Sequence, residues 1–144
     1  MITLREVNKD NFFEVIRLKV KENQKDFVAT NIFSIAQSKV QPECIPYAIY
    51  NDEIAVGFLM YCIDVDDNNY WIYRLMIDEK YQGRGFGYKA MEIIMNKIKE
   101  DKNHNVIFIS FEPENHGARL LYEKLGFVSD NRIIEDEVVY RYNY

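Results

Sequence analysis

The spacing of apolar residues along the chain predicts four helices. The clearest pattern runs through residues 86–101, where apolar side chains recur at i, i+3, i+4, i+7 and i+8. Weaker patterns with the same period occupy three further segments. Gly126 directly follows the last of these, as expected of a residue that ends a helix. The helices expected are residues 10–20, 27–39, 86–101 and 116–125.

Shorter apolar runs with alternating or two-sided patterns predict seven strands. Residues 70–78 are apolar and aromatic on both faces, which is typical of a strand in the centre of a sheet. The polar residues Asn51, Asp52 and Glu53 separate two of the strands and predict a hairpin turn. The strands expected are residues 2–7, 47–50, 54–63, 70–78, 106–111, 127–130 and 138–142.

The expected elements follow the order β-α-α-β-β-β-α-β-α-β-β. Antiparallel strands followed by crossover helices imply an α/β (α+β) fold with one mixed, mostly antiparallel sheet of about seven strands and helices on both faces. The 144 residues suit one domain over residues 1–144, because the chain has only 3 prolines and no Ser/Gly-rich linker.

One short segment, YQGRGFGYK at residues 81–89, is not explained by packing alone. It follows an expected strand and opens an expected helix, which is where backbone N–H groups often bind phosphate. It lacks the G-x-x-x-x-G-K-S/T pattern of nucleoside-triphosphate-binding loops. It also lacks the dinucleotide-binding fingerprint, since Tyr88 stands where that pattern needs glycine.

The helix after this segment begins without the residues that usually stabilise a helix start. No Ser, Thr, Asp or Asn lies between residues 82 and 88 to cap it. The first carboxylate is Glu92, while Arg84 and Lys89 add positive charge to the positive end of the helix dipole. A bound phosphate would complete this helix start. A glycine-rich turn for close packing would explain the glycines, but neither the missing cap nor the cations.

The segment resembles the pyrophosphate-binding motif of the GNAT acyltransferase superfamily, Q/R-x-x-G-x-G/A, which binds acyl-coenzyme A. Gln82, Gly85 and Gly87 fill its three fixed positions. A second segment, from Asn115 to Phe127, resembles the family pattern N-x-x-A-x-x-x-Y-x-x-x-G-F. The two segments occur in the order typical of the family, one strand apart, and the resemblance extends over nearly the whole chain.

The resemblance implies where acetyl-CoA binds and coenzyme A is released. The pyrophosphate would lie on the backbone of residues 82–88, and the pantetheine arm beside strand 70–78. This strand then needs a free edge, so strands 70–78 and 106–111 are expected to splay apart. A backbone N–H there would polarise the thioester carbonyl. The residues expected to bind acetyl-CoA are Leu75, Met76, Ile77, Gln82, Gly83, Arg84, Gly85, Phe86, Gly87, Tyr88, Asn115 and Tyr122.

The resemblance also implies that Tyr122 is a general acid, which protonates the departing thiolate. A phenol titrates near pH 10 and holds its proton at neutral pH. Taken alone, Tyr122 would be interpreted as a core residue. Asn115 would contact the pantetheine, cap the helix that follows, or do both.

An amine acceptor must lose a proton before it attacks, at a cost of roughly 4.6 kcal/mol for a lysine-like amine at pH 7. Some relatives carry a carboxylate on the central strand, where this chain has Tyr73. Glu112, at the end of strand 106–111, is a candidate base. Water-relayed proton loss to several acidic groups is the alternative.

The charge distribution bears on the acceptor. The net charge is −5, which argues against a nucleic-acid partner. Residues 1–72 carry 7 Lys/Arg and 11 Asp/Glu, a net of −4, whereas residues 73–144 carry 11 and 12, a net of −1. Residues 20–31 and the central YRLMIDEKYQGRGFG are similar to bacterial spermidine/spermine acetyltransferases. Carboxylates would steer such a polycation, so the acceptor residues expected are Glu22 and Asp26, with Asp64, Asp66 and Asp67 either contributing or forming a solvated turn. Tyr73 is also expected at the acceptor, where it could add a cation–π contact or belong to the core.

Several other classes of site or partner are not expected. No apolar stretch is long enough to cross a membrane, and the N-terminus has no signal-peptide pattern, so we expect a cytoplasmic protein without a membrane partner. The two cysteines and two histidines lack metal-ligand spacing, so no metal is expected. Strand 138–142 is expected at an edge of the sheet, where it could pair across a homodimer.

The leading hypothesis is an N-acetyltransferase that acetylates a polyamine or diamine by direct attack in a ternary complex, without a protein nucleophile. A second hypothesis keeps this chemistry but makes the acceptor a protein N-terminus, a lysine or a small amine such as an antibiotic. A third is a non-catalytic regulatory protein that binds acyl-CoA.

Overall fold

A computed structural model describes residues 1–144 and confirms the expected order of helices and strands. It adds one short 3₁₀ helix, η1. The elements are β1 (Ile2–Glu6), α1 (Phe12–Arg17), η1 (Glu22–Gln24), α2 (Asn31–Val40), β2 (Ile45–Asn51), β3 (Ile54–Ile63), β4 (Tyr70–Ile77), α3 (Phe86–Lys99), β5 (Val106–Phe111), α4 (His116–Lys124), β6 (Val128–Ile134) and β7 (Glu137–Asn143).

The strands form one mixed, mostly antiparallel sheet, as the sequence predicts. Their spatial order is β1-β2-β3-β4-β5-β7-β6. Only β4 and β5 run parallel; every other neighbouring pair is antiparallel. The two-sided apolar strand β4 lies fourth of the seven, so its expected central position is confirmed.

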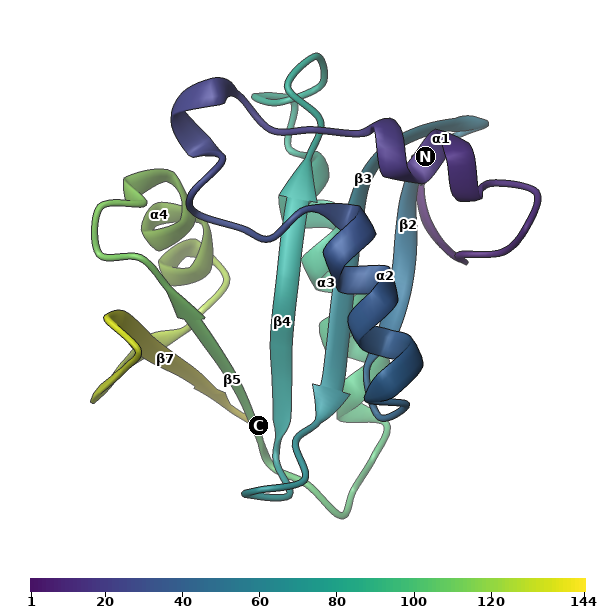
Figure 1. The fold of residues 1–144 in the computed structure, drawn as a ribbon. Helices are drawn as coiled ribbons and strands as arrows, with labels where there is room; N and C mark the ends of the chain where they lie inside the picture. Colours follow the sequence, from purple (N-terminus) through teal and green to yellow (C-terminus); the bar gives the residue numbers. More distant parts are fainter.

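Helices cover both faces of this sheet, and each face has its own core. Figure 1 shows α2 in front of the sheet and α3 behind it. The rear core contains the apolar stripe of α3 together with Tyr122 of α4, and it is the larger of the two. The front core packs Val15 of α1 against residues of β2, β3 and β4. The periodicity of α3 therefore arises because only one of its faces meets the sheet.

The two central strands separate partway along their length. Their parallel pairing covers Tyr70 to Ile72 only. At that point β4 carries an extra residue, Tyr73, since Met60 pairs with Arg74 while Tyr61 pairs with Ile72. Such a bulge bends a strand and ends regular pairing. The expected splay between β4 and β5 is thus confirmed, and Figure 1 shows β5 leaning away from β4.

Two predicted helices are shorter than expected. The helix expected over residues 10–20 ends at Arg17, because Leu18 has extended backbone angles. The helix expected over residues 27–39 begins only at Asn31, where Thr30 caps it by accepting a hydrogen bond from the Phe33 N–H at 3.2 Å. The intervening residues 18–30 instead cross the front of β4 toward α4 (Figure 1).

The expectation that strand 138–142 lies at an edge is wrong. This strand is part of β7, which pairs with β5 on one side and β6 on the other. The buried Val139 and Tyr140 explain its inner position, because each packs against a core. The edge strand is β6, six of whose seven residues are exposed. The predicted homodimer through strand 138–142 therefore has no free edge to use.

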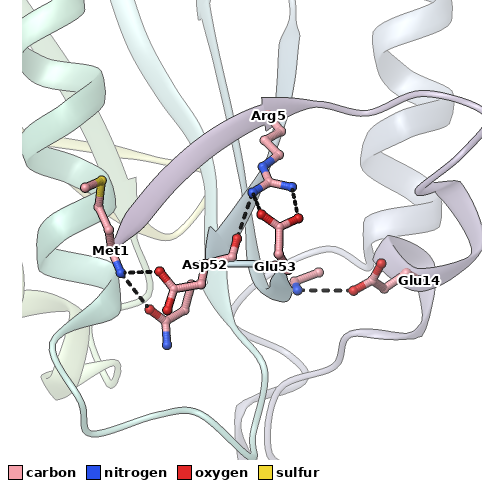
Figure 2. Close-up of polar contacts among 7 residues, drawn as sticks. Met1, Arg5, Glu14, Asp52 and Glu53 are labelled. Atoms are coloured by element: carbon pink, nitrogen blue, oxygen red, sulfur yellow. Dashed lines mark hydrogen bonds and ion pairs between the residues drawn. The ribbon is translucent and has the colours of Figure 1, made fainter.

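The predicted hairpin turn at Asn51–Glu53 is confirmed, and polar contacts fix it to two other elements (Figure 2). Arg5 of β1 donates to the Asp52 carbonyl at 2.7 Å and to both carboxylate oxygens of Glu53 at 3.3 Å. Glu14 of α1 accepts a hydrogen bond from the Ala55 N–H at 3.1 Å. These contacts tie β1, the hairpin and α1 together.

Candidate active site

A cavity of about 320 Å³ opens where β4 and β5 part. Its walls come from both strands, from the glycine segment before α3, from the start of α4 and from the crossing segment 18–30. On the side facing β5, the backbone of β4 beyond Ile72 has no strand partner. The cavity therefore holds both the open edge of β4 and the open start of α3.

The glycine segment presents bare backbone to this cavity. Gly83 and Gly85 both have φ of +80°, a left-handed conformation that side chains other than glycine rarely adopt. A Cβ at either position would meet nothing within 4 Å, so open space lies beside both residues. Gly85 is the N-cap of α3 and no side chain caps the helix, which confirms the uncapped start inferred from the sequence. Free N–H groups and the helix dipole together suit an anionic phosphate.

Gln82 fastens the glycine segment on two sides. Its amide nitrogen donates to the Ile77 carbonyl at 2.9 Å and to the Gln24 side-chain oxygen at 2.9 Å. Gln24 in turn donates to the side-chain oxygen of Gln82 at 3.2 Å. These bonds connect the end of β4, the glycine segment and η1, and so hold the segment 18–30 over the cavity.

The buried carboxylate of Asp78 makes a second connection at the end of β4. Its two oxygens accept hydrogen bonds from the backbone N–H groups of Lys19 and Lys80, both at 3.0 Å. The Glu79 N–H also donates to the Lys19 carbonyl at 2.8 Å. Residue 19 therefore joins the end of β4 almost as a strand would, which explains why α1 stops just before it.

Tyr122 lies on the α4 side of the cavity and is only 6 % exposed. Its ring packs against Phe111 and Phe127, with centroids 5.5 and 6.0 Å away. Its hydroxyl has no hydrogen-bond partner within the chain, which is unusual for a buried tyrosine. Burial, and next the charge of Glu137, raise the pKa of Tyr122 above its usual range. The group therefore keeps its proton at neutral pH.

Asn115 has both of the positions expected for it. Its side-chain oxygen accepts a hydrogen bond from the Ala118 N–H at 3.2 Å, which caps α4. The residue also lines the cavity beside Tyr122. The cap orients the first turn of α4, and the whole helix lies within the segment that matched the second family pattern.

The β4 side of the cavity is more polar than its sequence suggested. Tyr73 lines the cavity, and its hydroxyl donates to the carboxylate of Asp64. Arg74 is half-buried in the same wall and donates to Gln37 at 2.8 Å, while its Nε is buried without a partner. Burial lowers the pKa of Arg74. A guanidinium nevertheless stays protonated at neutral pH, so Arg74 places one positive charge on this wall.

Most residues expected to bind the coenzyme meet at the cavity, but two do not. The guanidinium of Arg84 lies 5.7 Å from the Tyr81 ring and outside the cavity wall, and Tyr88 packs under Lys124. The residues from the prediction that line the cavity are Leu75, Met76, Ile77, Gln82, Gly83, Gly85, Phe86, Gly87, Asn115 and Tyr122.

The carboxylates expected on the acceptor side lie outside the cavity wall. Glu22 is paired with Lys25 at 2.6 Å, and Asp26 is exposed. Glu112 is half-buried just past the end of β5. Its pKa is raised, first by desolvation and then by Glu137. Of the turn residues, Asp67 accepts a hydrogen bond from Trp71, as Asp64 does from Tyr73, so these two carboxylates fix the base of β4.

Sequence reasoning missed several residues that shape the site. Gln24, Asp78 and Arg74 act through contacts between segments far apart in the chain, which no local pattern reveals. Ser110, in the β5 wall of the cavity, was also missed. Its place on β5 follows from the alternation of that strand, whose neighbouring residues Ile109 and Phe111 face the rear core.

Neither cysteine belongs to this site. Cys44 and Cys62 are buried and free, and neither lines the cavity. Burial is the largest cause that raises the pKa of Cys62 to about 12, so the group is a thiol rather than a nucleophilic thiolate. No group of three or more His, Cys, Asp or Glu is arranged to hold a metal ion.

Comparison with known sequences identifies relatives along most of the chain. Residues 3–127 match the profile of the "Acetyltransferase (GNAT) family". A spermine/spermidine N(1)-acetyltransferase of Bacillus subtilis is 30% identical over 132 residues, which cover 88% of this chain and 87% of that protein.

Solved structures share the fold at low identity. A spermidine N-acetyltransferase from Vibrio cholerae, in complex with CoA and spermine, has a TM-score of 0.75 at 16% identity, over 97% of this chain and 92% of the other. An aminoglycoside acetyltransferase in complex with coenzyme A has a TM-score of 0.81 at 15% identity, over 99% and 95%. In the present fold, no helix combines the length and the apolar character needed to cross a membrane.

Proposed function

Since the chain belongs to the acetyltransferase (GNAT) family, we propose that it transfers the acetyl group of acetyl-CoA to a primary amine of a polyamine such as spermidine or spermine. The chain is an N-acetyltransferase of this family, with acetyl-CoA as its co-substrate. The proposal concerns the acceptor, the residue roles and the route of the protons.

One observation supports this assignment more than any other. The unpartnered Tyr122 hydroxyl, the open edge of β4 and the uncapped start of α3 all face one cavity of about 320 Å³. Each presents polar groups that have no hydrogen-bond partner within the chain and that a ligand in the cavity could reach. Acetyl-CoA carries a pyrophosphate that suits the start of α3, an amide-rich arm that suits the open edge of β4, and a thioester that suits the Tyr122 hydroxyl.

The residues present fit the coenzyme. Gly83 and Gly85 leave backbone N–H groups and open space for the pyrophosphate. Leu75, Met76 and Ile77 would pair with the amides of the pantetheine arm, because their backbone has no partner from β5. Asn115 would contact the same arm while it caps α4. Arg84 and Tyr88 would act from outside the cavity wall.

Tyr122 would act as the general acid. Acetyl-CoA supplies its acetyl group as an activated thioester. The amine nitrogen bonds to the acetyl carbon as the carbon–sulfur bond breaks, and Tyr122 donates its proton to the sulfur. A backbone N–H of β4 would stabilise the negative charge that develops on the carbonyl oxygen. No cysteine takes part, because both thiols are buried away from the cavity.

The acceptor must also lose a proton, and Glu112 is the proposed base. Its raised pKa, due to desolvation and then to Glu137, brings this carboxylate nearer to the range in which it can accept a proton. Glu112 lies outside the cavity wall, so a water molecule would carry the proton to it. The alternative is that water molecules carry the proton to several carboxylates rather than to Glu112 alone.

A polyamine is the proposed acceptor because of the relative from Bacillus subtilis and because of local charge. Glu112 has four other carboxylates among the groups that raise its pKa, from Glu137, Glu114, Asp136 and Asp26. Negative charges gathered on one side of a site attract a polycation and raise its local concentration. Asp26 and Glu22 would contribute to this attraction from the segment 18–30.

The test is release of coenzyme A with a panel of amines at equal concentration. The panel contains spermine, spermidine, putrescine, lysine, an aminoglycoside and a short peptide with a free N-terminus. Selective turnover of spermine and spermidine is expected. Preference for the peptide or the aminoglycoside would refute the polyamine assignment, and binding of acetyl-CoA without turnover of any amine would favour a regulatory role.

A further inference from the structure

We propose that Glu137 binds a protonated nitrogen of the acceptor next to Tyr122, and so makes the enzyme selective for amines with a second positive charge. This inference rests on the proposed function and names the residue that would recognise the acceptor. Glu137 is the first residue of β7 and lies outside both motifs of the family, after the end of the second.

A hydrogen bond fixes Glu137 directly behind Ser110 in the cavity wall, although Glu137 itself is not a lining residue. The Ser110 hydroxyl donates to a carboxylate oxygen of Glu137 at 2.8 Å, and Ser110 lines the cavity. The pairing of β5 with β7 sets this geometry, because Ser110 lies opposite Val139, two residues from Glu137 on the same face. The second carboxylate oxygen makes no hydrogen bond within the chain and remains available to a ligand.

Glu137 is also close to the reacting end of the site. Val138, the next residue, pairs with Phe111, whose ring lies 5.5 Å from that of Tyr122 on the rear face of the sheet, while Glu137 and Ser110 lie at the same level on the front face. Tyr122 is 6 % exposed, lines the same cavity and lacks a partner for its hydroxyl. Glu137 is the one charged group that raises the pKa of Tyr122, and it also affects Arg74 and Glu112.

The charges around the cavity favour an ammonium group at Glu137. Arg74 places a positive charge on the β4 wall and interacts electrostatically with Glu137, so a polycation is repelled near Arg74 and attracted near Glu137. Spermidine and spermine carry a secondary nitrogen three or four carbons from each primary amine. An ammonium held by Glu137 would therefore leave the neighbouring primary amine free to approach the thioester. A monoamine would lack this contact.

Glu137→Gln removes the charge while keeping the size of the side chain and a hydrogen-bond partner for Ser110. We expect KM for spermidine to rise about 10- to 100-fold, the range for loss of one charge-assisted contact, while kcat changes little. The loss should be larger for spermidine than for butylamine, and the KM of the unaltered enzyme should rise more steeply with salt. Coenzyme A affinity and far-UV circular dichroism confirm that the variant is folded.

Two further variants separate binding from structure. Glu135→Gln removes the same charge from an exposed residue of the β6–β7 turn and should leave both constants unchanged. Ser110→Ala keeps the charge but releases the carboxylate, so a smaller rise in KM is expected. The inference is overturned if Glu137→Gln lowers kcat without raising KM, or if Glu135→Gln has an equal effect. Failure of the unaltered enzyme to acetylate any polyamine would instead refute the proposed function, and this inference with it.

Discussion

Single residues of the site combine a structural and a chemical contribution. Gly85 ends the loop in a left-handed conformation and begins α3 without a cap. Asn115 caps α4 and faces the cavity with the same side chain. Tyr122 packs in the rear core while its hydroxyl stays unpaired. Each residue can therefore be probed by a change that removes one contribution and keeps the other.

Gly85→Ala should weaken coenzyme binding more than it destabilises the fold. The new methyl group would meet no protein atom within 4 Å. The free energy of unfolding should therefore fall only by the strain of an alanine in the left-handed conformation, about 1–2 kcal/mol. The same methyl would project into the space assigned to the pyrophosphate. Calorimetry should show at least tenfold weaker binding of coenzyme A, with unfolding shifted by no more than that strain. Unaltered affinity would mean that the phosphate binds elsewhere.

The thiol of Cys62 should resist alkylation in the folded protein. Burial raises its pKa to about 12, so at pH 8 only about one molecule in ten thousand carries the reactive thiolate. The folded pKa lies above the usual value, so reactivity should increase with pH through and beyond the ordinary thiol range. Mass spectrometry after iodoacetamide treatment should show label only after unfolding. Rapid labelling with loss of turnover at pH 8 would place a cysteine in the mechanism.

At the scale of elements, the site depends on an interruption of the sheet. The bulge at Tyr73 ends the pairing of β4 with β5, and the segment 18–30 crosses the resulting gap. Asp78, Gln82 and Gln24 fasten that segment to the end of β4. The cavity therefore keeps its shape through side-chain hydrogen bonds where ladder bonds are missing.

Asp78→Ala should destabilise the protein by about 2–4 kcal/mol, because two backbone N–H groups lose their buried acceptor. Denaturant unfolding measures this loss, and hydrogen exchange at Lys19 should become faster. Asp66→Ala is the matched control, since that exposed side chain makes no hydrogen bond in the structure and should change stability by less than about 0.5 kcal/mol. Equal effects of the two substitutions would show that the hydrogen bonds of Asp78 do not stabilise the fold.

For the whole molecule, local patterns predicted the elements and placed part of the cavity lining, including the glycine segment and Tyr122. The stripe of α3, the two-sided run of β4 and the uncapped glycine segment each follow from adjacent residues. The order of β6 and β7 did not, because it depends on which strand buries more against the cores. The early end of α1 also did not, since Asp78 lies 59 residues from its partner Lys19. Contacts of this kind are set by tertiary packing, which one sequence does not reveal.

The distribution of charge across the molecule agrees with this account of the acceptor. The acidic first half places Glu22 and Asp26 in the segment over the cavity, while Glu112 and Glu137 belong to the second half. The fold thus brings carboxylates from both halves to one end of the sheet. The net charges of residues 1–72 and 73–144 could not locate these carboxylates, because the segment 18–30 of the first half lies beside residues of the second half in the fold.

The most direct test of the central claim is a paired measurement on Tyr122→Phe: turnover with spermidine and affinity for coenzyme A. The substitution removes only the unpaired hydroxyl, so the packing against Phe111 and Phe127 should persist. The account predicts that kcat falls by about 10²- to 10⁴-fold, the usual effect of losing a general acid, with coenzyme A affinity unchanged. Turnover equal to that of the unaltered enzyme would remove Tyr122 from the mechanism and contradict the account.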